Sequence, residues 1–190
     1  HPSYYPTLYF NYLKCIANTA LYGKNVMDTL YFHPGQTYHF GTADTQYVVN
    51  DWIAQGNCYN DITLITPTGN SFVKKINGNV FLNRVKLQGV HALGNATYTI
   101  GDGIDMGGNS NWNINPIAPI DHYWVNGTGN WNDTAHWSYS SNGPSGACIP
   151  TQFDNVYFDS LAFPDTSIVS LDFPQAVCHD MDWTGAKFKP

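Results

Sequence analysis

The stretch Gln46–Ile100, QYVVNDWIAQGNCYNDITLITPTGNSFVKKINGNVFLNRVKLQGVHALGNATYTI, decides the fold of this chain. Its strand-like runs begin fifteen to eighteen residues apart and are QYVVN (46–50), DITLIT (61–66), NVFLNRVKL (79–87) and ATYTI (96–100). The gaps between them carry Gly, Asn and Pro, which are typical of turns. Short strands separated by turns at this spacing indicate either a β-sandwich or a β-solenoid.

Three features favour the solenoid. The spacing resembles one coil of a parallel β-helix, Asn is abundant at the turns, and the strand residues are large without clean polar alternation. A sandwich would show paired hairpins with two-residue turns, and Asn77-Gly78 is the one good candidate. The echo of Thr7–Phe10 (TLYF) in Thr29–Phe32 supports a repeat. We therefore predict a right-handed parallel β-helix, with β-sandwich modules as the alternative.

The composition agrees with an all-β chain. All fourteen acidic residues are Asp, no Glu occurs, and Arg84 is the sole arginine, whereas helical proteins normally place Glu, Lys and Arg on their wet faces. A net charge of −6 argues against binding to nucleic acid or to an anionic membrane surface. No run approaches twenty apolar residues, so we expect no membrane insertion.

A Pro-containing segment divides the chain. Pro116 and Pro119 stiffen the backbone and remove two amide donors. The sequence thus predicts the end of a β-solenoid module over residues 1–115, a linker over 116–121 and the start of a second β module over 122–190.

The second module opens with YWVNGTGNWNDTAHWS (123–138), in which three tryptophans are separated by turn-forming residues. We expect Trp124, Trp131 and Trp137 to form a loop that caps the first coil, and Trp112 to close the preceding module, because a solenoid end leaves its core uncovered. The alternative is a platform on which exposed Trp and Tyr rings stack against sugars.

Three acidic places could carry chemistry. His179, Asp180 and Asp182 lie close together, and Asp154 and Asp159 flank a strand. Asp102 and Asp105, in a Gly-rich loop, are weak candidates for calcium ligands. Asp at strand ends more often terminates turns, and the sequence shows no zinc spacing, phosphate loop or Ser-His-Asp order. We therefore expect no catalytic residues, no resident metal and no cofactor.

The four cysteines are Cys15, Cys58, Cys148 and Cys178. They form no CxxC pair, and we expect two disulfides because the rest of the composition is typical of extracellular proteins. Four cysteines allow three pairings, and the residues alone leave all three open.

The order of YWVNGTGNWNDTAHWS, GPSGACIP (143–150), DNVYFDSLAF (154–163) and CHDMDWTG (178–185) resembles a module of very large surface proteins of Bacteroidota. Proteins of that family are exported by the type IX secretion system, and many belong to gliding or adhesive organisms. The resemblance spans about residues 28–185, and it implies an extracellular location at the cell surface.

The resemblance also implies particular residues. It places a disulfide between Cys148 and Cys178, which leaves Cys15–Cys58 as the second pair. It further implies O-glycosylation at Asp-Ser/Thr-apolar motifs, whose acceptors here would be Thr29, Thr134 and Ser160.

Three hypotheses of function follow. The first is a non-catalytic structural repeat segment of a surface protein, adhesin or filament, whose ends near Tyr4–Phe10 and Trp183–Phe188 are covered by neighbouring segments or by copies of the chain. The second is a carbohydrate-binding module for surface glycans that uses exposed Trp and Tyr. The third and weakest is a β-helical polysaccharide lyase or hydrolase.

Overall fold

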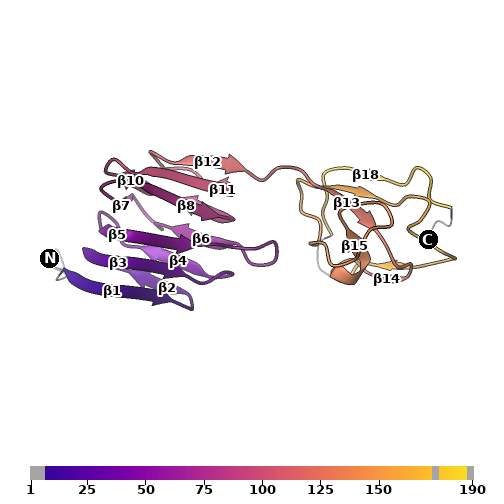
Figure 1. Cartoon of the computed structure of the whole chain (residues 1–190), viewed down its shortest axis with the longest axis horizontal. Coiled ribbons are helices and arrows are strands. Elements are labelled where there is room, and N and C mark those ends of the chain that lie inside the picture. The colour runs from indigo at the N-terminus through magenta and orange to yellow at the C-terminus, as the bar shows by residue number, and fades with distance from the viewer. Residues whose placement is uncertain (1–6, 173–175, 188–190) are drawn as a thin grey trace. The chain divides into compact units, whose positions relative to one another are not determined.

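The computed structural model describes residues 7–172 and 176–187. These residues form β-strands and contain no α-helix; one 3₁₀ turn, η1, spans Thr134–His136. The chain divides into two compact units, His1–Ile117 and Ala118–Pro190 (Figure 1). The predicted all-β class is confirmed.

The described residues of the first unit, 7–117, contain twelve strands and the turns between them. They are β1 (Leu8–Cys15), β2 (Thr19–Leu21), β3 (Asn25–Phe32), β4 (Thr37–Phe40), β5 (Thr45–Ala54), β6 (Ile62–Ile65), β7 (Ser71–Lys74), β8 (Asn79–Asn83), β9 (Val85–Gln88), β10 (Val90–Leu93), β11 (Thr97–Asp105) and β12 (Asn113–Pro116).

These strands form parallel sheets. The first sheet has the order β1-β3-β5-β7-β10, the second has the order β12-β11-β9-β6-β4-β2, and β8 pairs with β11. From β1 to β6 the chain passes alternately between the two sheets, so each strand lies beside the strand from the preceding coil (Figure 1). All the described strand ladders of this unit are parallel, which is not the hairpin-based pattern of a β-sandwich.

The long strands of the first sheet bend in the middle. In β3 the buried residues are Asn25, Met27, Leu30 and Phe32. Residues 28 and 29 interrupt the alternation of buried and open positions, so the strand turns a corner there. One long strand therefore contributes to two sides of the coil.

A buried lysine holds the equivalent corner of β5. Lys75 is 8% exposed, and its ammonium group donates to the carbonyl oxygen of Val49 at 2.7 Å and to that of Asn50. These two carbonyls lie where β5 turns. The lysine therefore donates to carbonyl oxygens that the bend leaves without a strand partner.

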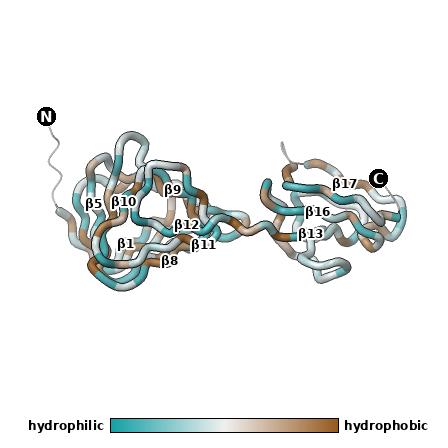
Figure 2. Tube along the Cα trace, turned by 90° about the horizontal axis from the view of Figure 1, so that it is seen from above, coloured by the Kyte–Doolittle hydropathy of each residue, from teal (hydrophilic) through white to brown (hydrophobic). Residues whose placement is uncertain are grey.

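The core consists of inward side chains stacked in register, with hydrophobic residues recurring along the strands (Figure 2). Leu13 lies beside Leu30, which lies beside Trp52 on the third coil. Phe32 packs edge-on against Trp52, with ring centroids 6.3 Å apart. Such stacking buries each layer between the coils on its two sides.

The pairing of β1 with β3 does not align the two TLYF segments on which the predicted repeat was based. Phe10 lies beside Met27 and Tyr12 beside Thr29, an offset of seventeen residues rather than twenty-two. The two TLYF segments are therefore on different halves of the bent strands, because the spacing of the core residues sets the register. Asn77-Gly78 also forms no hairpin, since it joins β7 to β8, which pair with other strands.

A pair of buried amides replaces apolar residues at one position of the stack. The Asn25 side chain donates to Gln46 Oε1 at 2.8 Å and to the Tyr22 carbonyl at 3.1 Å, and Gln46 Nε2 donates to the Gly23 carbonyl at 3.1 Å. Asn25 is 3% exposed and Gln46 is fully buried. Burial of these groups is tolerated because they bond to each other and to the turn before β3.

The second unit contains short strands around its own core. They are β13 (Asp121–Trp124), β14 (Gly129–Asn130), β15 (Trp137–Ser138), β16 (Asn155–Tyr157), β17 (Val169–Ser170) and β18 (Met181–Asp182). One sheet has the order β15-β13-β16-β18, in which β13, β16 and β18 are parallel and β15 is antiparallel; β14 pairs with β17 in parallel.

We expect the buried amides to be coupled. Gln46→Leu should lower the free energy of unfolding by about 1–3 kcal/mol, because it leaves an Asn25 donor without its partner. In a double-mutant cycle with Asn25→Leu, the combined variant should lose less stability than the sum of the two single variants. Urea unfolding measures all four proteins, and strictly additive losses would contradict the coupling.

Candidate functional site

The two ends of the parallel stack in the first unit are finished differently. At the edge of β10, side chains from the loop after β11 occupy the free backbone groups. Asn109 Oδ1 accepts from the Val90 amide at 3.0 Å, and Asn111 Nδ2 donates to the Ala92 carbonyl at 2.9 Å. Together with the Ser110 carbonyl, which accepts from the Ala92 amide at 3.0 Å, these side chains satisfy the edge of β10 where a full strand would otherwise pair.

Trp112 covers the core beside this edge. Its indole N–H donates to the Val90 carbonyl at 3.1 Å, and its ring packs edge-on against Tyr98 and Trp52 at centroid distances of 5.0 and 5.7 Å. Trp112 therefore lies where a closing residue of this module is needed.

The opposite end lacks such a cover among the described residues. β1 and β2 are the edge strands of their sheets. Large apolar side chains on and beside them are exposed, namely Leu8 (47%), Tyr9 (76%), Tyr12 (53%), Ile16 (63%) and Tyr22 (55%). Exposed apolar groups gathered on a sheet edge are typical of an interaction surface.

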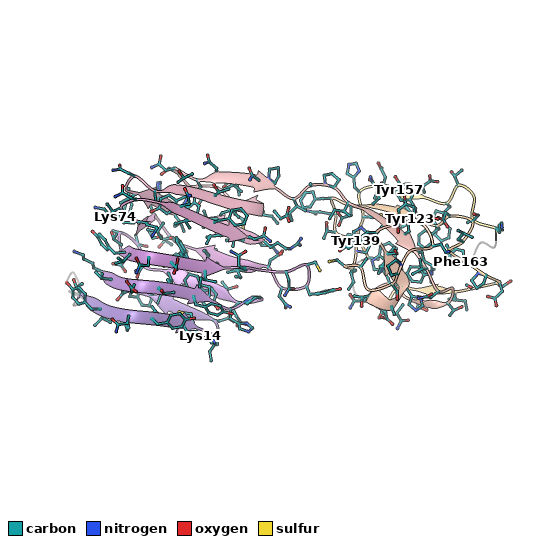
Figure 3. The ribbon with its side chains drawn as sticks, viewed as in Figure 1. Lys14, Lys74, Tyr123, Tyr139, Tyr157 and Phe163 are labelled. Atoms are coloured by element: carbon teal, nitrogen blue, oxygen red, sulfur yellow. The ribbon has the colours of Figure 1, made fainter. Side chains whose placement is uncertain are left out.

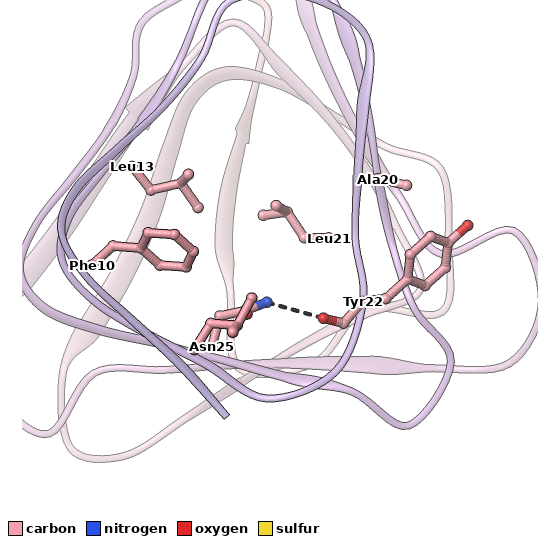
Figure 4. Close-up of a pocket in the computed structure, with 7 residues that line it drawn as sticks. Phe10, Leu13, Ala20, Leu21, Tyr22 and Asn25 are labelled. Carbon is pink, nitrogen blue, oxygen red and sulfur yellow. Dashed lines mark hydrogen bonds between the residues drawn. The ribbon is translucent and has the colours of Figure 1, made fainter. Parts of the chain in front are cut away.

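A pocket of about 130 Å³ opens into the core at this end. Figure 4 shows Phe10, Leu13 and Leu21 pointing into the space that the coil encloses, while Tyr22 points away from it. The residues lining the pocket, which we call the open end, are Leu8, Phe10, Leu13, Ala20, Leu21, Tyr22 and Asn25.

The open end is lined mainly by apolar side chains, like an interior layer of the stack, and not by groups suited to a reaction centre. One step further into the stack, Phe10 lies beside the fully buried Met27 and Leu13 beside the fully buried Leu30. A further parallel coil would pair with β1 and place its own apolar side chains on Phe10 and Leu13, as each coil does for the next.

The Trp residues of the second unit form its core. Trp124, Trp131 and Trp137 are 1%, 3% and 0% exposed. Trp137 packs edge-on against Trp124 at 5.0 Å and against Trp131 at 4.9 Å. Both Trp124 and Trp137 bond their indole N–H to nearby carbonyls, of Gly127 and Trp131, at 2.7 Å. Buried rings offer no face to a sugar, so the structure gives the stacking platform no support.

Trp137 also lies at the edge of a sheet. It lies on β15, which pairs antiparallel with β13 and occupies the outer edge of the parallel strands β13, β16 and β18. β15 is antiparallel, so the series of parallel strands ends at this edge. Its tryptophan packs into the core of the second unit.

We expect Trp137 to be the main anchor of the second unit. Trp137→Ala should cost about 3–5 kcal/mol of unfolding free energy, because it removes a fully buried aromatic ring. Leu171→Ala, at a site that is 66% exposed, should change stability by less than about 0.5 kcal/mol. Chemical denaturation checks both, and equal effects would contradict the core position of Trp137.

The candidate carboxylates are engaged in local structure. Asp154 is 3% exposed and accepts from the Ile120 amide and from both the amide and hydroxyl of Thr151, at 2.7–3.0 Å. Asp159 accepts from the Leu161 amide at 2.8 Å. These bonds are those of turn-forming Asp residues.

The sequence places His179, Asp180 and Asp182 together, but the two carboxylates have separate partners. The imidazole of His179 is 3.2 Å from Asp180, and both side chains are exposed. Asp182 accepts from the Thr184 amide at 2.6 Å, and hydrogen bonds from Thr184 lower the pKa of the Asp182 carboxyl. The arrangement does not raise the pKa of Asp182, as a general acid would require.

The two candidate calcium ligands also have roles in the local loop structure. Asp105 Oδ1 accepts from the Gly107 amide at 2.8 Å and from Asn109 Nδ2 at 2.7 Å, and Asp102 occupies a left-handed backbone position with φ of 46°. Within residues 7–172 and 176–187 no group of three or more His, Cys, Asp or Glu side chains could hold a metal ion.

Sequence reasoning missed a buried histidine in the second unit. His122 is 1% exposed and lies edge-on to the rings of Trp137 and Tyr139 at 6.2 and 5.2 Å. Burial lowers the pKa of its imidazole, with the nearby Asp154 carboxylate acting in the opposite direction. A single His between two strand residues gave no signal in the sequence, because its burial depends on the Trp core.

The predicted disulfides Cys148–Cys178 and Cys15–Cys58 are wrong. The structure has one disulfide, Cys58–Cys148, and leaves Cys15 and Cys178 as free thiols. Cys15 is part of the first core and Cys178 packs against the Trp core, so each thiol serves as a small apolar side chain. Burial raises the pKa of both thiols.

We expect two free thiols per chain in unfolded, unreduced protein and four after reduction. Cys58→Ser should raise the unreduced count to three, because it releases Cys148, whereas Cys15→Ser should lower it to one. In the folded protein Cys15, 5% exposed, should react more slowly than Cys178. Titration with a thiol reagent measures these counts, and a value of zero or four before reduction would contradict the pairing.

The proposed glycosylation acceptors are all half-buried. Thr29 is at the corner of β3, Thr134 is the first residue of η1, and Ser160 lies within the turn that Asp159 stabilises. Of the predicted ends of the chain, 4–6 and 188 lie outside the described residues.

No family model, curated protein or solved structure matches this chain. In the part of the chain that the structure describes, no helix has the length and apolar character needed to cross a membrane.

Proposed function

We propose that this chain is a non-catalytic structural segment of an extracellular surface protein, adhesin or filament, built from right-handed parallel β-helix. The observation that carries the proposal is the difference between the two ends of the first stack. Trp112 and two asparagines finish one end, while the open end presents a pocket, a free strand edge and exposed apolar residues.

The parallel ladders support the β-helical part. Successive strands of the first sheet lie side by side in the order in which they occur in the chain, as coils of a solenoid do. In the second unit, β13, β16 and β18 repeat this order, with β15 at the outer edge of β13. A Trp-capped start of a second module accounts for that arrangement.

The non-catalytic part is supported by the candidate acids. Asp154, Asp159 and Asp182 each accept backbone amide protons in turns, and Asp105 does the same before β12. Carboxylates engaged in this way shape loops and are poorly placed to transfer protons.

The extracellular location is supported by the disulfide and by the resemblance to Bacteroidota surface proteins of the type IX secretion system. Disulfides persist in oxidising environments and are rare in the cytosol. The Cys58–Cys148 bond fits such an environment.

The partners of a structural segment follow from the open end. A parallel β-coil, from a neighbouring segment or from another copy of this chain, would pair with β1 and cover Phe10 and Leu13. A head-to-tail contact whose rotation does not close generates an open filament or an elongated surface protein, whereas contact between two open ends closes as a dimer.

We expect the isolated chain to self-associate through the open end. Sedimentation velocity over a range of concentrations should show association that Leu8→Lys weakens, because a charge at the mouth of the pocket opposes burial and lysine protects sheet edges. The matched control is Ile76→Lys, at a 67% exposed turn position, which should associate as the unmodified chain does. A chain that remains monomeric at every soluble concentration would contradict the proposal.

A further inference from the structure

We propose that the outer face of the first sheet binds an acidic polysaccharide through Lys24 and Lys74, which Tyr47 holds in position. This site lies on the outer face next to the open end, and its proposed ligand does not depend on the function proposed above.

The register brings the relevant side chains together from distant parts of the sequence. Tyr9, Val26, Tyr47, Lys74 and Leu93 are neighbours across the five strands of the sheet. They alternate with buried residues along their strands and therefore lie on the outer face. Thr45, Phe72 and His91 form the adjacent outer row, and the rings of Phe72 and His91 are 5.6 Å apart.

Tyr47 fixes two cations above this face. The Lys24 ammonium is 4.9 Å from the centre of the Tyr47 ring, and the Lys74 ammonium is 5.5 Å from it. Both distances are within the range of cation–π attraction. A lysine side chain held against a ring loses less conformational freedom when a ligand binds, so the two charges are preorganised for an anion.

The lysines near Tyr47 are not used in ion pairs. Among the described residues, Arg84 and Lys86 pair with Asp61, which precedes β6 of the second sheet, whereas no ion pair involves Lys14, Lys24 or Lys74. Lys14 also lies over a tyrosine, with its ammonium 5.2 Å from the Tyr31 ring. Figure 3 shows Lys14 and Lys74 extending from the strands of the first unit. In a chain with net charge −6, unpaired cations grouped with tyrosines mark a surface suited to an anion.

The chemistry of the face favours a carboxylated sugar polymer. Sugar rings have apolar C–H faces that pack on aromatic side chains, and Tyr9, at 76% exposure, and Phe72 provide rings beside the lysines. Neighbouring strands are about 4.8 Å apart, so Tyr9 and Tyr47 are separated by about 9.6 Å along a flat, rigid face. A repeating, extended polymer can follow such a face from one strand to the next.

The net charge selects among anionic polymers. A chain with net charge −6 repels a nucleic acid or an anionic membrane, whose charges are densely packed. A polymer with one carboxylate per sugar has a lower charge density and can still pair with the two fixed lysines.

The test is a titration of the chain with polygalacturonate and, separately, with a neutral dextran of similar length, by calorimetry in low salt. We expect binding to polygalacturonate that weakens as salt is added. Lys24→Gln/Lys74→Gln should weaken it about tenfold. The control Lys86→Gln/Lys187→Gln removes the same charge elsewhere and should change the affinity by less than about twofold.

Tyr47→Leu tests whether the ring holds the cations. This variant keeps both lysines, so a weakening smaller than that of the double lysine variant, but larger than that of the control, is expected. Matching circular dichroism spectra and unfolding curves show that the variants remain folded.

Several results would overturn the proposal. They are the absence of binding, equal binding of dextran, an equal loss in the control variant, and tighter binding to DNA or to vesicles containing phosphatidylserine than to polygalacturonate.

Discussion

The structure depends on one constraint, which is that every coil of a parallel stack must be covered by the next. An inward side chain such as Leu30 is fully buried because Leu13 lies on one side of it and Trp52 on the other. No single coil encloses enough apolar surface to be stable alone, so stability comes from the contacts between coils. The ends of the stack are therefore the places where the fold needs a special solution.

The chain contains different solutions to this problem. After β11, asparagine side chains and the Ser110 backbone bond to the edge of β10, and Trp112 covers the core beside it. In the second unit an antiparallel strand, β15, occupies the edge and brings Trp137 into the core. The edge of β1 has neither device among the described residues, and its pocket is lined by side chains that match an interior layer. This difference between the ends is the basis of the function proposed above.

The class of the fold could be predicted from the sequence, but its register could not. The missing Glu and the spacing of runs such as 61–66 and 96–100 indicated strands, and β6 and β11 lie there. The register depends on where a strand bends, and two consecutive open residues in β3 look like any other pair of polar residues in the sequence. Consequently the TLYF echo pointed to an offset of twenty-two residues where the structure has seventeen.

The same limit explains the cysteines and the lysine–tyrosine contacts. The sequence predicts that Cys15 forms a disulfide. The structure shows a free thiol that packs in the apolar core. Lys24 and Lys74 are fifty residues apart, and they share a ring only because two coils bring β3, β5 and β7 side by side. In a parallel stack the inner face is set by the alternation within each strand, which a sequence displays directly. The outer face is set by the pairing between strands, and new combinations of charge and aromatic surface arise there without any local motif. Recognition by such a chain is therefore to be looked for across the strands, where residues that are distant in the sequence lie side by side.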